Sequence, residues 1–206
     1  MGIYREKVLP RIVNRACGMK LAEPLRARVC AGLHGQVLEI GFGSGLNIPH
    51  YPPGVTAVAA IEPADLAWTL AADRLAATTV PITRSGLDGQ KLPLPDDSCD
   101  SALSTWTLCT IPDVTTALDE VRRVLKPGGT LHFVEHGLAP DDNVQRWQHR
   151  LESMQKRIFG GCHLTRPIAD LLTAAGFTIS ELDVFYEEGA PKFLAADSLG
   201  FAVGVP

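Results

Sequence analysis

The sequence predicts a single α/β domain with a doubly wound, seven-stranded sheet that is mostly parallel and ends in an antiparallel hairpin. Short apolar runs alternate with amphipathic helical patterns, as in a parallel sheet with helices on both faces. The first apolar run stops at a glycine-rich turn, and the last two runs lie close together, which indicates the hairpin. A chain of 206 residues is long enough for one domain with a full core.

The first expected strand, Val37–Ile40, leads into three glycines on alternate positions, Gly41, Gly43 and Gly45. Glycine tolerates a positive φ and lets a ligand approach the main chain closely. If a helix follows, its free N–H groups also point at the ligand. The spacing differs from the G-x-G-x-x-G loop of dinucleotide-binding proteins. An acidic residue, Glu39, stands two positions before the first glycine.

The later elements follow in alternation. Asp65–Ala77 is an alanine-rich helix pattern with an acidic cap candidate, and Pro167–Ala175 is a helix closed by a glycine. Val114–Leu125 carries an apolar stripe behind a cap candidate at Asp113, and it ends at the turn 126–129. The remaining strands are expected at Ala57–Glu62, Val80–Arg84, Cys99–Trp106, Thr130–His136, Thr178–Phe185 and Phe193–Val203.

Residues 1–35 precede the first strand and are expected to form a helical cap. Residues 1–28 hold seven basic residues against Glu6 and Glu23, beside a helical apolar stripe. A basic amphipathic helix can lie on an anionic membrane surface. The favoured alternative is a helix that packs on the domain and covers the ligand site.

Residues 137–166 are expected to form a helical insertion over the acceptor site. Insertions after the fifth strand of a doubly wound sheet lie over its carboxyl edge. The helix Asn143–Phe159 has apolar residues at three- and four-residue steps, and we expect this seam to pack on its own domain. The seam consists of Val144, Trp147, Leu151, Met154 and Ile158.

The composition excludes several classes of protein. A net charge of -4 argues against a nucleic-acid partner, because such proteins carry a basic surface. The five cysteines have no C-x-x-C spacing and are odd in number, which fits a reducing compartment rather than a disulfide framework. No apolar run is long enough to span a membrane, and no signal peptide is recognisable. We expect a cytoplasmic protein, with peripheral membrane contact as the alternative.

Glu62 ends the second expected strand, about 21 positions after Gly41, the spacing at which a doubly wound fold presents a carboxylate to a ribose diol. A carboxylate there accepts two charge-assisted hydrogen bonds from the hydroxyls. Nicotinamide and adenosylmethionine cofactors both carry such a ribose. Glu62 therefore predicts a cofactor with a nucleoside but does not distinguish between these two classes. The glycine spacing opposes a nicotinamide oxidoreductase.

Three segments in order resemble one family. The acidic-x-G-x-G-x-G loop at 39–45, the L-D-G-Q-K-L-P-L-P-D-D-S-C-D stretch at 87–100 and the L-D-E-V-R-R-V-L-K-P-G-G stretch at 118–129 are similar to motifs of class I S-adenosylmethionine (SAM) methyltransferases of the type 11 group. The resemblance implies a Rossmann-like fold and SAM as cofactor. Asp88 then accepts from the adenine amino group, and Gly89 supplies an N–H to the ring. Glu39 bonds loop N–H groups or reaches the methionine ammonium.

With the ribose carboxylate included, the expected cofactor-binding residues are Glu39, Gly41, Phe42, Gly43, Gly45, Asn47, Glu62, Pro63, Asp88, Gly89, Thr105 and Leu108.

The carboxyl half of the chain indicates which group of methyltransferases this sequence resembles. The stretches W-T-L-C-T-I at 106–111, F-V-E-H at 133–136 and F-G-G-C-H-L-T-R at 159–166 are similar to those of microsomal alkyl-thiol S-methyltransferases. We expect this chain to resemble a soluble member without their hydrophobic N-terminal anchor. The resemblance implies a small-molecule acceptor, with a thiol as the first choice. The expected acceptor pocket comprises Trp106, Cys109, His136, Cys162, His163 and Arg166.

His136 is the candidate catalytic base, because it ends the fifth expected strand, where ligands bind in such sheets, and histidine titrates in the useful range. The alternative is a structural histidine bonded to Glu135 or to a backbone carbonyl. Arg166 either pairs with a carboxylate such as Glu135 or binds an anionic substrate. The adjacent Cys162 and His163 lack a second ligand pair at a zinc-like spacing, so no metal site is expected.

Other functions stay open at this level. The acceptor could be a phenol, a quinol or a lipid amine, giving an O- or N-methyltransferase. The protein could also bind SAM without catalysis, or bind NAD as an oxidoreductase. The sequence leaves the oligomeric state open.

Overall fold

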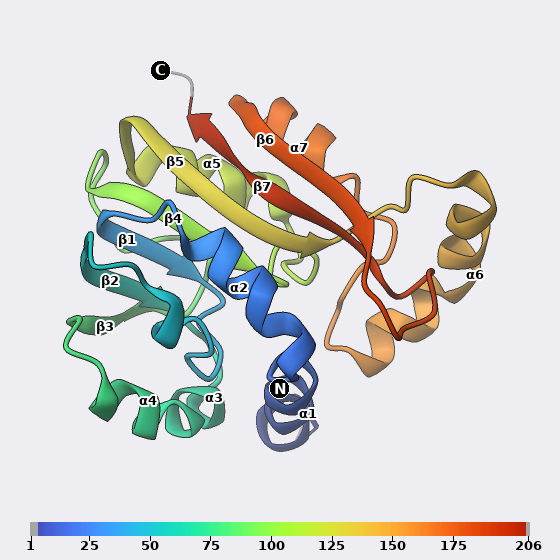
Figure 1. The fold of residues 1–206 in the computed structure, drawn as a ribbon, viewed down its shortest axis with the longest axis horizontal. Coiled ribbons are helices and arrows are strands. Elements are labelled where there is room, and N and C mark those ends of the chain that lie inside the picture. The colour runs from blue at the N-terminus through green and yellow to red at the C-terminus, as the bar shows by residue number, and fades with distance from the viewer. Residues whose placement is uncertain (1–3, 205–206) are drawn as a thin grey trace.

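The computed structural model describes residues 4–204, and it contains one seven-stranded sheet with the order β3-β2-β1-β4-β5-β7-β6. The four pairs among β1 to β5 are parallel, and β7 runs antiparallel to both of its neighbours. The predicted doubly wound sheet is therefore confirmed (Figure 1). The C-terminal pair is a hairpin in which the later strand, β7, enters between β5 and β6.

The strands are β1 Gly35–Ile40, β2 Val55–Ile61, β3 Ile82–Gly86, β4 Cys99–Thr105, β5 Leu125–His136, β6 Phe177–Tyr186 and β7 Ala196–Gly204. The α-helices are α1 Leu9–Cys17, α2 Glu23–Cys30, α3 Asp65–Leu70, α4 Ala72–Ala77, α5 Val114–Val124, α6 Asp142–Ile158 and α7 Ile168–Ala174. Shorter turns of helix are η1 Tyr4–Val8, η2 Lys20–Ala22 and η3 Ile48–His50.

The last strand begins three residues later than predicted, at Ala196 rather than Phe193, and two further elements need correction. The helix predicted over residues 65–77 is divided at Ala71 into α3 and α4. The fifth strand begins at Leu125, five residues earlier than predicted, because Leu125 already pairs with Cys99. The next ladder pair joins Ser101 to Thr130, so the predicted turn at 126–129 is present as an irregular stretch inside β5. The predicted cap of α5 is confirmed, since the Asp113 side chain accepts a hydrogen bond from the Thr116 N–H.

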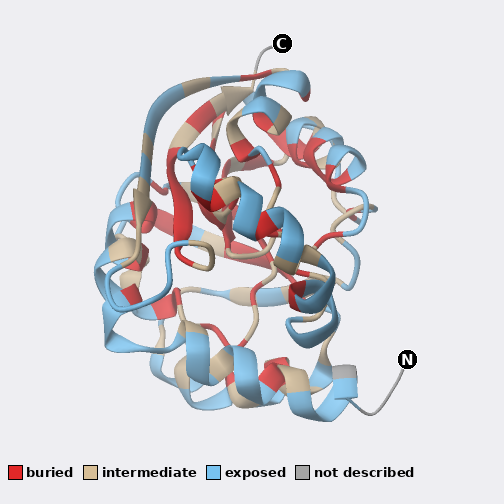
Figure 2. Cartoon of the chain, turned by 90° about the vertical axis from the view of Figure 1, so that its right-hand side faces the viewer, coloured by how far each residue is buried: buried red, intermediate tan, exposed pale blue. Residues whose placement is uncertain are grey.

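Helices cover both faces of the sheet, and each face has its own core (Figure 1). On one face, α5 and α7 pack on Leu38 and Ile40 of β1. On the other face, α2 packs on Val37, because successive residues of a strand point to opposite sides. Figure 2 shows that the outward surfaces of the helices are exposed while buried residues gather along the strands. The amino-terminal segment therefore belongs to the domain core through α2.

The apolar seam predicted for α6 does not pack on the domain as expected. Val144 is buried, but Trp147 and Met154 are about half exposed. The buried residues further along α6 are instead Gln148 and Gln155. The Gln148 amide accepts from the Ala139 N–H at 2.9 Å and donates to the Gly137 carbonyl at 3.1 Å. The helix is held by these polar contacts and by Val144, which packs on Ala139 and Ala196, while Trp147, Met154 and Ile158 of its apolar stripe face outward.

None of the helices within residues 4–204 combines the length and the apolar character that a membrane crossing requires.

Candidate active site

The glycine turn after β1 has the backbone that the sequence predicts. Gly41, Gly43 and Gly45 all have positive φ, at 71°, 58° and 73°. A Cβ on Gly41 would collide with the side chain of Thr107, whereas at Gly43 it would meet little more than the Gly41 carbonyl oxygen at 3.8 Å. The loop therefore leaves an open approach to the main chain at Gly43. The loop continues into the three-residue turn η3 rather than into a long helix. A ligand there would therefore meet the N–H groups of the loop and nearby side chains, and not the N-terminus of a long helix.

Glu62 follows β2 and faces this loop. Its carboxylate accepts the Gly43 N–H and the Ala64 N–H, each at 2.7 Å, and the residue is 6% exposed. Burial raises the pKa of Glu62, and the two backbone N–H groups oppose that rise. Each carboxylate oxygen keeps a further lone pair. Both oxygens are thus fixed in place and can still accept hydrogen bonds from a diol.

Glu39 lies at the centre of a buried polar network beneath the loop. It accepts the Asn47 amide at 2.9 Å and the hydroxyl of Tyr51. Asn47 also donates to the Thr105 hydroxyl at 3.0 Å. The first of the two predicted roles of Glu39, a bond to loop N–H groups, is wrong, because its partners among the described residues are the side chains of Asn47 and Tyr51. Burial raises the pKa of Glu39 to about 7, although Tyr51 and Asn47 act in the opposite direction.

Arg26 enters this network from α2. It is 4% exposed, donates to the Asn47 side-chain oxygen at 2.6 Å, and lies 4.9 Å from the ring centre of Trp106. Burial lowers the pKa of Arg26, with the charge of Glu39 among the groups that raise it. From the sequence, Arg26 is one of seven basic residues in a segment expected either to cover the ligand site or to lie on a membrane surface, and it is given no role of its own. The structure places it inside the site instead.

Asp88 and Gly89 lie in the loop after β3. Asp88 is exposed, and its carboxylate accepts the Gln90 N–H at 2.9 Å. A Cβ on Gly89 would lie 3.2 Å from Ile40 and 3.4 Å from Ile111. Gly89 therefore passes close to the end of β1 over an apolar surface, with a carboxylate beside it.

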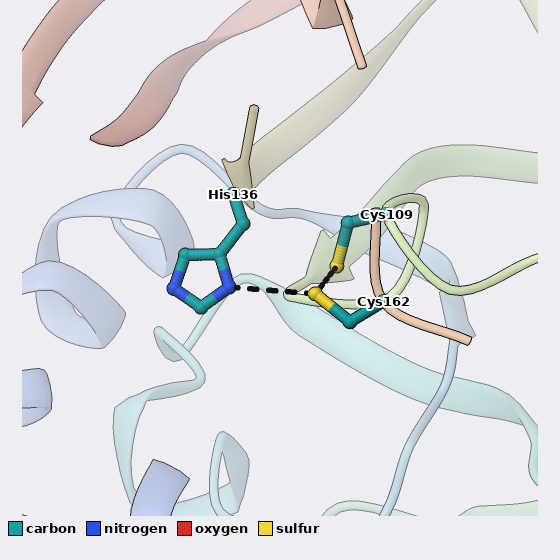
Figure 3. Close-up of side chains that lie close together, drawn as sticks. All are labelled: Cys109, His136 and Cys162. Carbon is teal, nitrogen blue, oxygen red and sulfur yellow. Dashed lines mark hydrogen bonds between the residues drawn. The ribbon is translucent and has the colours of Figure 1, made fainter. Parts of the chain in front are cut away.

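A cluster of two sulfur atoms and one ring nitrogen lies at the carboxyl end of β5. Figure 3 shows the Cys162 sulfur between the other two groups, at 3.6 Å from the Cys109 sulfur and 3.8 Å from Nδ1 of His136. Cys109 follows β4, His136 ends β5, and Cys162 follows α6. Both cysteines are buried. The neighbouring Cys109 thiol, with His136 assisting, outweighs burial and lowers the pKa of Cys162 to about 5.

The other nitrogen of His136 faces Asp197 of β7, with Nε2 and Oδ1 3.5 Å apart. Asp197 is 1% exposed and accepts the Trp106 indole N–H at 3.0 Å. Burial lowers the pKa of His136, but the hydrogen bond with Cys162 and the charge of Asp197 outweigh it and raise that pKa to about 9. The ring of His136 therefore lies between Asp197 and Cys162. The structural alternative expected it to bond to Glu135 or to a backbone carbonyl instead.

Glu135 and Arg166 hold the loop between β4 and α5. Glu135 accepts the Ser104 hydroxyl at 2.6 Å and the N–H groups of Thr107 and Cys109. Arg166 donates to the carbonyls of Leu108 and Ile111. The predicted pairing of Arg166 with Glu135 is wrong, because each binds backbone groups of the same loop. The two charged residues fix the backbone that carries Cys109.

Comparisons with known proteins agree with this geometry. Residues 38–133 match the family model described as a methyltransferase domain. Thiol S-methyltransferase TMT1A of Homo sapiens is 33% identical over 84% of this chain and 73% of its own length. This chain belongs to the class I SAM-dependent methyltransferases. Thiol S-methyltransferase TMT1B of Rattus norvegicus is 35% identical over 71% of this chain. The chain spans just under two thirds of that methyltransferase.

Solved structures agree on the methyltransferase fold. A Haloferax volcanii methyltransferase, solved with the activator Trm112, has a TM-score of 0.71 at 16% identity over 96% of this chain and 94% of its own. A SAM-dependent methyltransferase of Thermotoga maritima has a TM-score of 0.66 at 22% identity, covering 95% and 94%. SAM is the cofactor of this family, and the open loop at Gly43 beside the Glu62 carboxylate fits its ribose.

The residues predicted from sequence for the cofactor and the acceptor differ in what they offer to a ligand. Phe42 and Leu108 have buried side chains in the cores, so only their main chains are available to a ligand. His163 pairs with Glu152 of α6 at 2.6 Å and is not part of the sulfur cluster. Pro63 is exposed beside Glu62.

Sequence reasoning missed Arg26, Tyr51 and Asp197. Of these, Asp197 could have been recognised in the sequence, because it is a charged residue within an apolar strand pattern.

Proposed function

We propose that this methyltransferase transfers the methyl group of SAM to the sulfur of a small-molecule thiol. The observation that carries the proposal is the similarity to TMT1A, a thiol S-methyltransferase. A match over 84% of the chain reaches well beyond the family model at 38–133 and includes the segment that holds Cys109, His136 and Cys162. The likeness therefore extends to the residues beside the acceptor and not only to the cofactor loop.

Three groups are assigned to the cofactor. Glu62 binds the ribose hydroxyls with the lone pairs that the loop N–H groups leave free. Asp88 accepts from the adenine amino group, and Gly89 lets the ring lie against Ile40 and Ile111. When bound, SAM supplies a methyl group on a sulfonium, which leaves with the electron pair of the breaking carbon–sulfur bond.

The acceptor sulfur attacks that methyl carbon in line, and positive charge is neutralised rather than created, so positioning and the exclusion of water supply most of the rate. A free thiol has a pKa of about 8.5 and needs only moderate help to ionise. His136, protonated beside Cys162 and Asp197, stabilises a thiolate by its charge more readily than it removes a proton. We assign it that role in place of the general base.

A lipid amine is the second candidate acceptor. Phosphatidylethanolamine N-methyltransferase of Cereibacter sphaeroides is 28% identical over 57% of this chain. Ile12 and Val13 of the basic helix α1 are more than one third exposed, which suits contact with a membrane surface. Flotation with liposomes containing phosphatidylethanolamine, followed by an assay for its methylation, tests this candidate.

The deciding experiment offers labelled SAM with a panel of thiols, phenols, quinols and amines. We expect transfer to alkyl thiols and product S-methyl sulfides identified by mass spectrometry. Transfer to a phenol or amine, with none to any thiol, would reject the thiol acceptor and keep the methyltransferase. The five cysteines are free thiols in the structure, so the assay is run under reducing conditions, which match the proposed cytoplasmic setting.

A further inference from the structure

Cys109, His136 and Cys162 form a compact set of metal-binding atoms that the sequence did not predict. The two sulfur atoms and Nδ1 of His136 all lie within 4.8 Å of one another. The three residues come from three separate segments, so their convergence is a property of the fold (Figure 3). Sequence spacing pointed instead at the adjacent pair of Cys162 and His163, and His163 turns away to Glu152.

We propose that these three residues bind one Zn²⁺ ion. In a tetrahedral site, Zn–S bonds of about 2.3 Å and Zn–N bonds of about 2.0 Å put two sulfur ligands about 3.8 Å apart and a sulfur and a nitrogen about 3.5 Å apart. The observed separations are 3.6 Å between the sulfur atoms and 3.8 Å between the Cys162 sulfur and Nδ1. Two of the three ligand separations are thus already within about 0.3 Å of those required, and the third, between the Cys109 sulfur and His136, is within 4.8 Å.

The surroundings of His136 support this assignment independently. A histidine that binds zinc usually presents its other ring nitrogen to a carboxylate, which fixes the ring and its tautomer. Nε2 of His136 faces Asp197 Oδ1 at 3.5 Å. Within residues 4–204, that buried oxygen has no hydrogen-bond partner, while Oδ2 is held by Trp106. A proton on Nε2 would point at this oxygen and leave Nδ1 available to the ion.

The type of ligand favours zinc over a hard cation. Two thiolates and an imidazole suit Zn²⁺, while Mg²⁺ and Ca²⁺ require oxygen ligands. A second arrangement uses Nε2 of His136 with Glu187 and Asp197, and it would suit a harder ion. Binding at the sulfur side forms two Zn–S bonds and one Zn–N bond, and it releases a proton from each thiol that is still protonated and the Nδ1 proton of the His136 imidazolium.

Three protein ligands leave the fourth position of the ion open, as in catalytic zinc sites. If the acceptor is a thiol, as the proposed function states, its thiolate occupies that position. His136 is then a neutral ligand, and the ion supplies the positive charge that the imidazolium supplies in its absence.

The test uses the full chain, purified under anaerobic, reducing conditions, stripped with a chelator and titrated with Zn²⁺ and with Co²⁺. We expect one Zn²⁺ per chain by elemental analysis, and a cobalt complex with thiolate charge-transfer and tetrahedral absorption bands. Cys109→Ser and Cys162→Ser should lose the ion at one equivalent. Cys99→Ser is the matched control, because Cys99 is equally buried at the opposite end of β4 and should leave binding unchanged.

The wild-type titration is decisive without any variant. A reduced, folded chain that takes up no Zn²⁺ at equimolar concentration overturns the site. Binding that persists in both cysteine variants, or a cobalt spectrum without thiolate bands, also overturns it in favour of the carboxylate arrangement. These readouts need neither SAM nor acceptor, so they fail separately from the proposed function. Unchanged thiol methylation by the zinc-free protein would overturn only the role assigned to the fourth position.

Discussion

In the proposed site, Glu62 is the residue on which the binding of SAM depends most directly. Replacing it with alanine removes two charge-assisted hydrogen bonds to the ribose, and we expect the binding of SAM to weaken by about 2–3 kcal/mol. Calorimetry measures this loss.

Asp65→Ala is the control for this change, because Asp65 is a nearby carboxylate whose side chain is 92% exposed. Equal affinity for Glu62→Ala and the wild type would mean that the ribose binds elsewhere.

Glu39 makes the stability of the ligand-free protein depend on pH. Its pKa rises from 4.5 to about 7 on folding, chiefly through burial. Between these values the folded chain binds a proton that the unfolded chain has released, so stability falls as pH rises. Glu39→Gln has no such proton. As pH rises across this window, we expect the free energy of unfolding of Glu39→Gln to increase by about 2–3 kcal/mol relative to that of the wild type. Denaturant unfolding at several pH values measures the gain, and a pH-independent difference would contradict the assignment.

At the scale of single residues, the sequence was most informative where a backbone demand selects the residue type. Glycines with positive φ and a carboxylate at a fixed distance after them were predicted because few alternatives satisfy the geometry. Arg26, Tyr51 and Asp197 were not predicted, because their roles come from distant elements that meet only in the folded chain.

The helix α6 shows how an element can be predicted correctly and oriented wrongly. Its bounds agree with the sequence pattern within one residue, but its apolar stripe faces outward and Gln148 faces inward. The periodicity of apolar residues identifies a helix and one of its faces, and it does not say what covers that face. The parallel strands were located because buried strands read as continuous apolar runs, but their ends differ from the predicted bounds by up to five residues.

The orientation of α6 predicts that replacing a glutamine costs more stability than replacing a tryptophan, which is the reverse of what is usual. Gln148→Ala removes an amide that satisfies two buried backbone groups, and we expect a loss of about 1–3 kcal/mol in stability. Trp147→Ala, one position earlier and 54% exposed, should change stability by less than about 0.5 kcal/mol. Thermal or denaturant unfolding measures both, and a larger loss for the tryptophan variant would show that α6 packs by its apolar stripe.

At the scale of the whole molecule, the two amino-terminal helices, α1 and α2, have different roles. The helix α2 supplies Val29 and Cys30 to one of the cores, and the turn after it supplies Leu33. The helix α1 contacts the glycine loop chiefly through Asn14, whose side chain accepts the Ser44 hydroxyl at 2.6 Å. This division supports the predicted cap over the cofactor for α1 and makes α2 a part of the domain.

Removal of residues 1–18 separates these duties. We expect the truncated protein to unfold cooperatively and near the wild-type temperature, since α2 remains. S-adenosylhomocysteine should dissociate from it several times faster, because α1 no longer covers the loop. Stopped-flow displacement measures the rate, with Ser44→Ala as a milder variant. A large loss of melting temperature would instead make α1 structural.

The place of β7 in the sheet has a consequence for how this protein is made. As the ribosome releases the chain, β1 to β5 can form a parallel sheet on their own, but β6 finds no partner in it until β7 has emerged. Asp197 arrives with β7 and completes the surroundings of His136. The cofactor half can therefore assemble during synthesis, whereas the sulfur and histidine cluster matures only after nearly the whole chain is available.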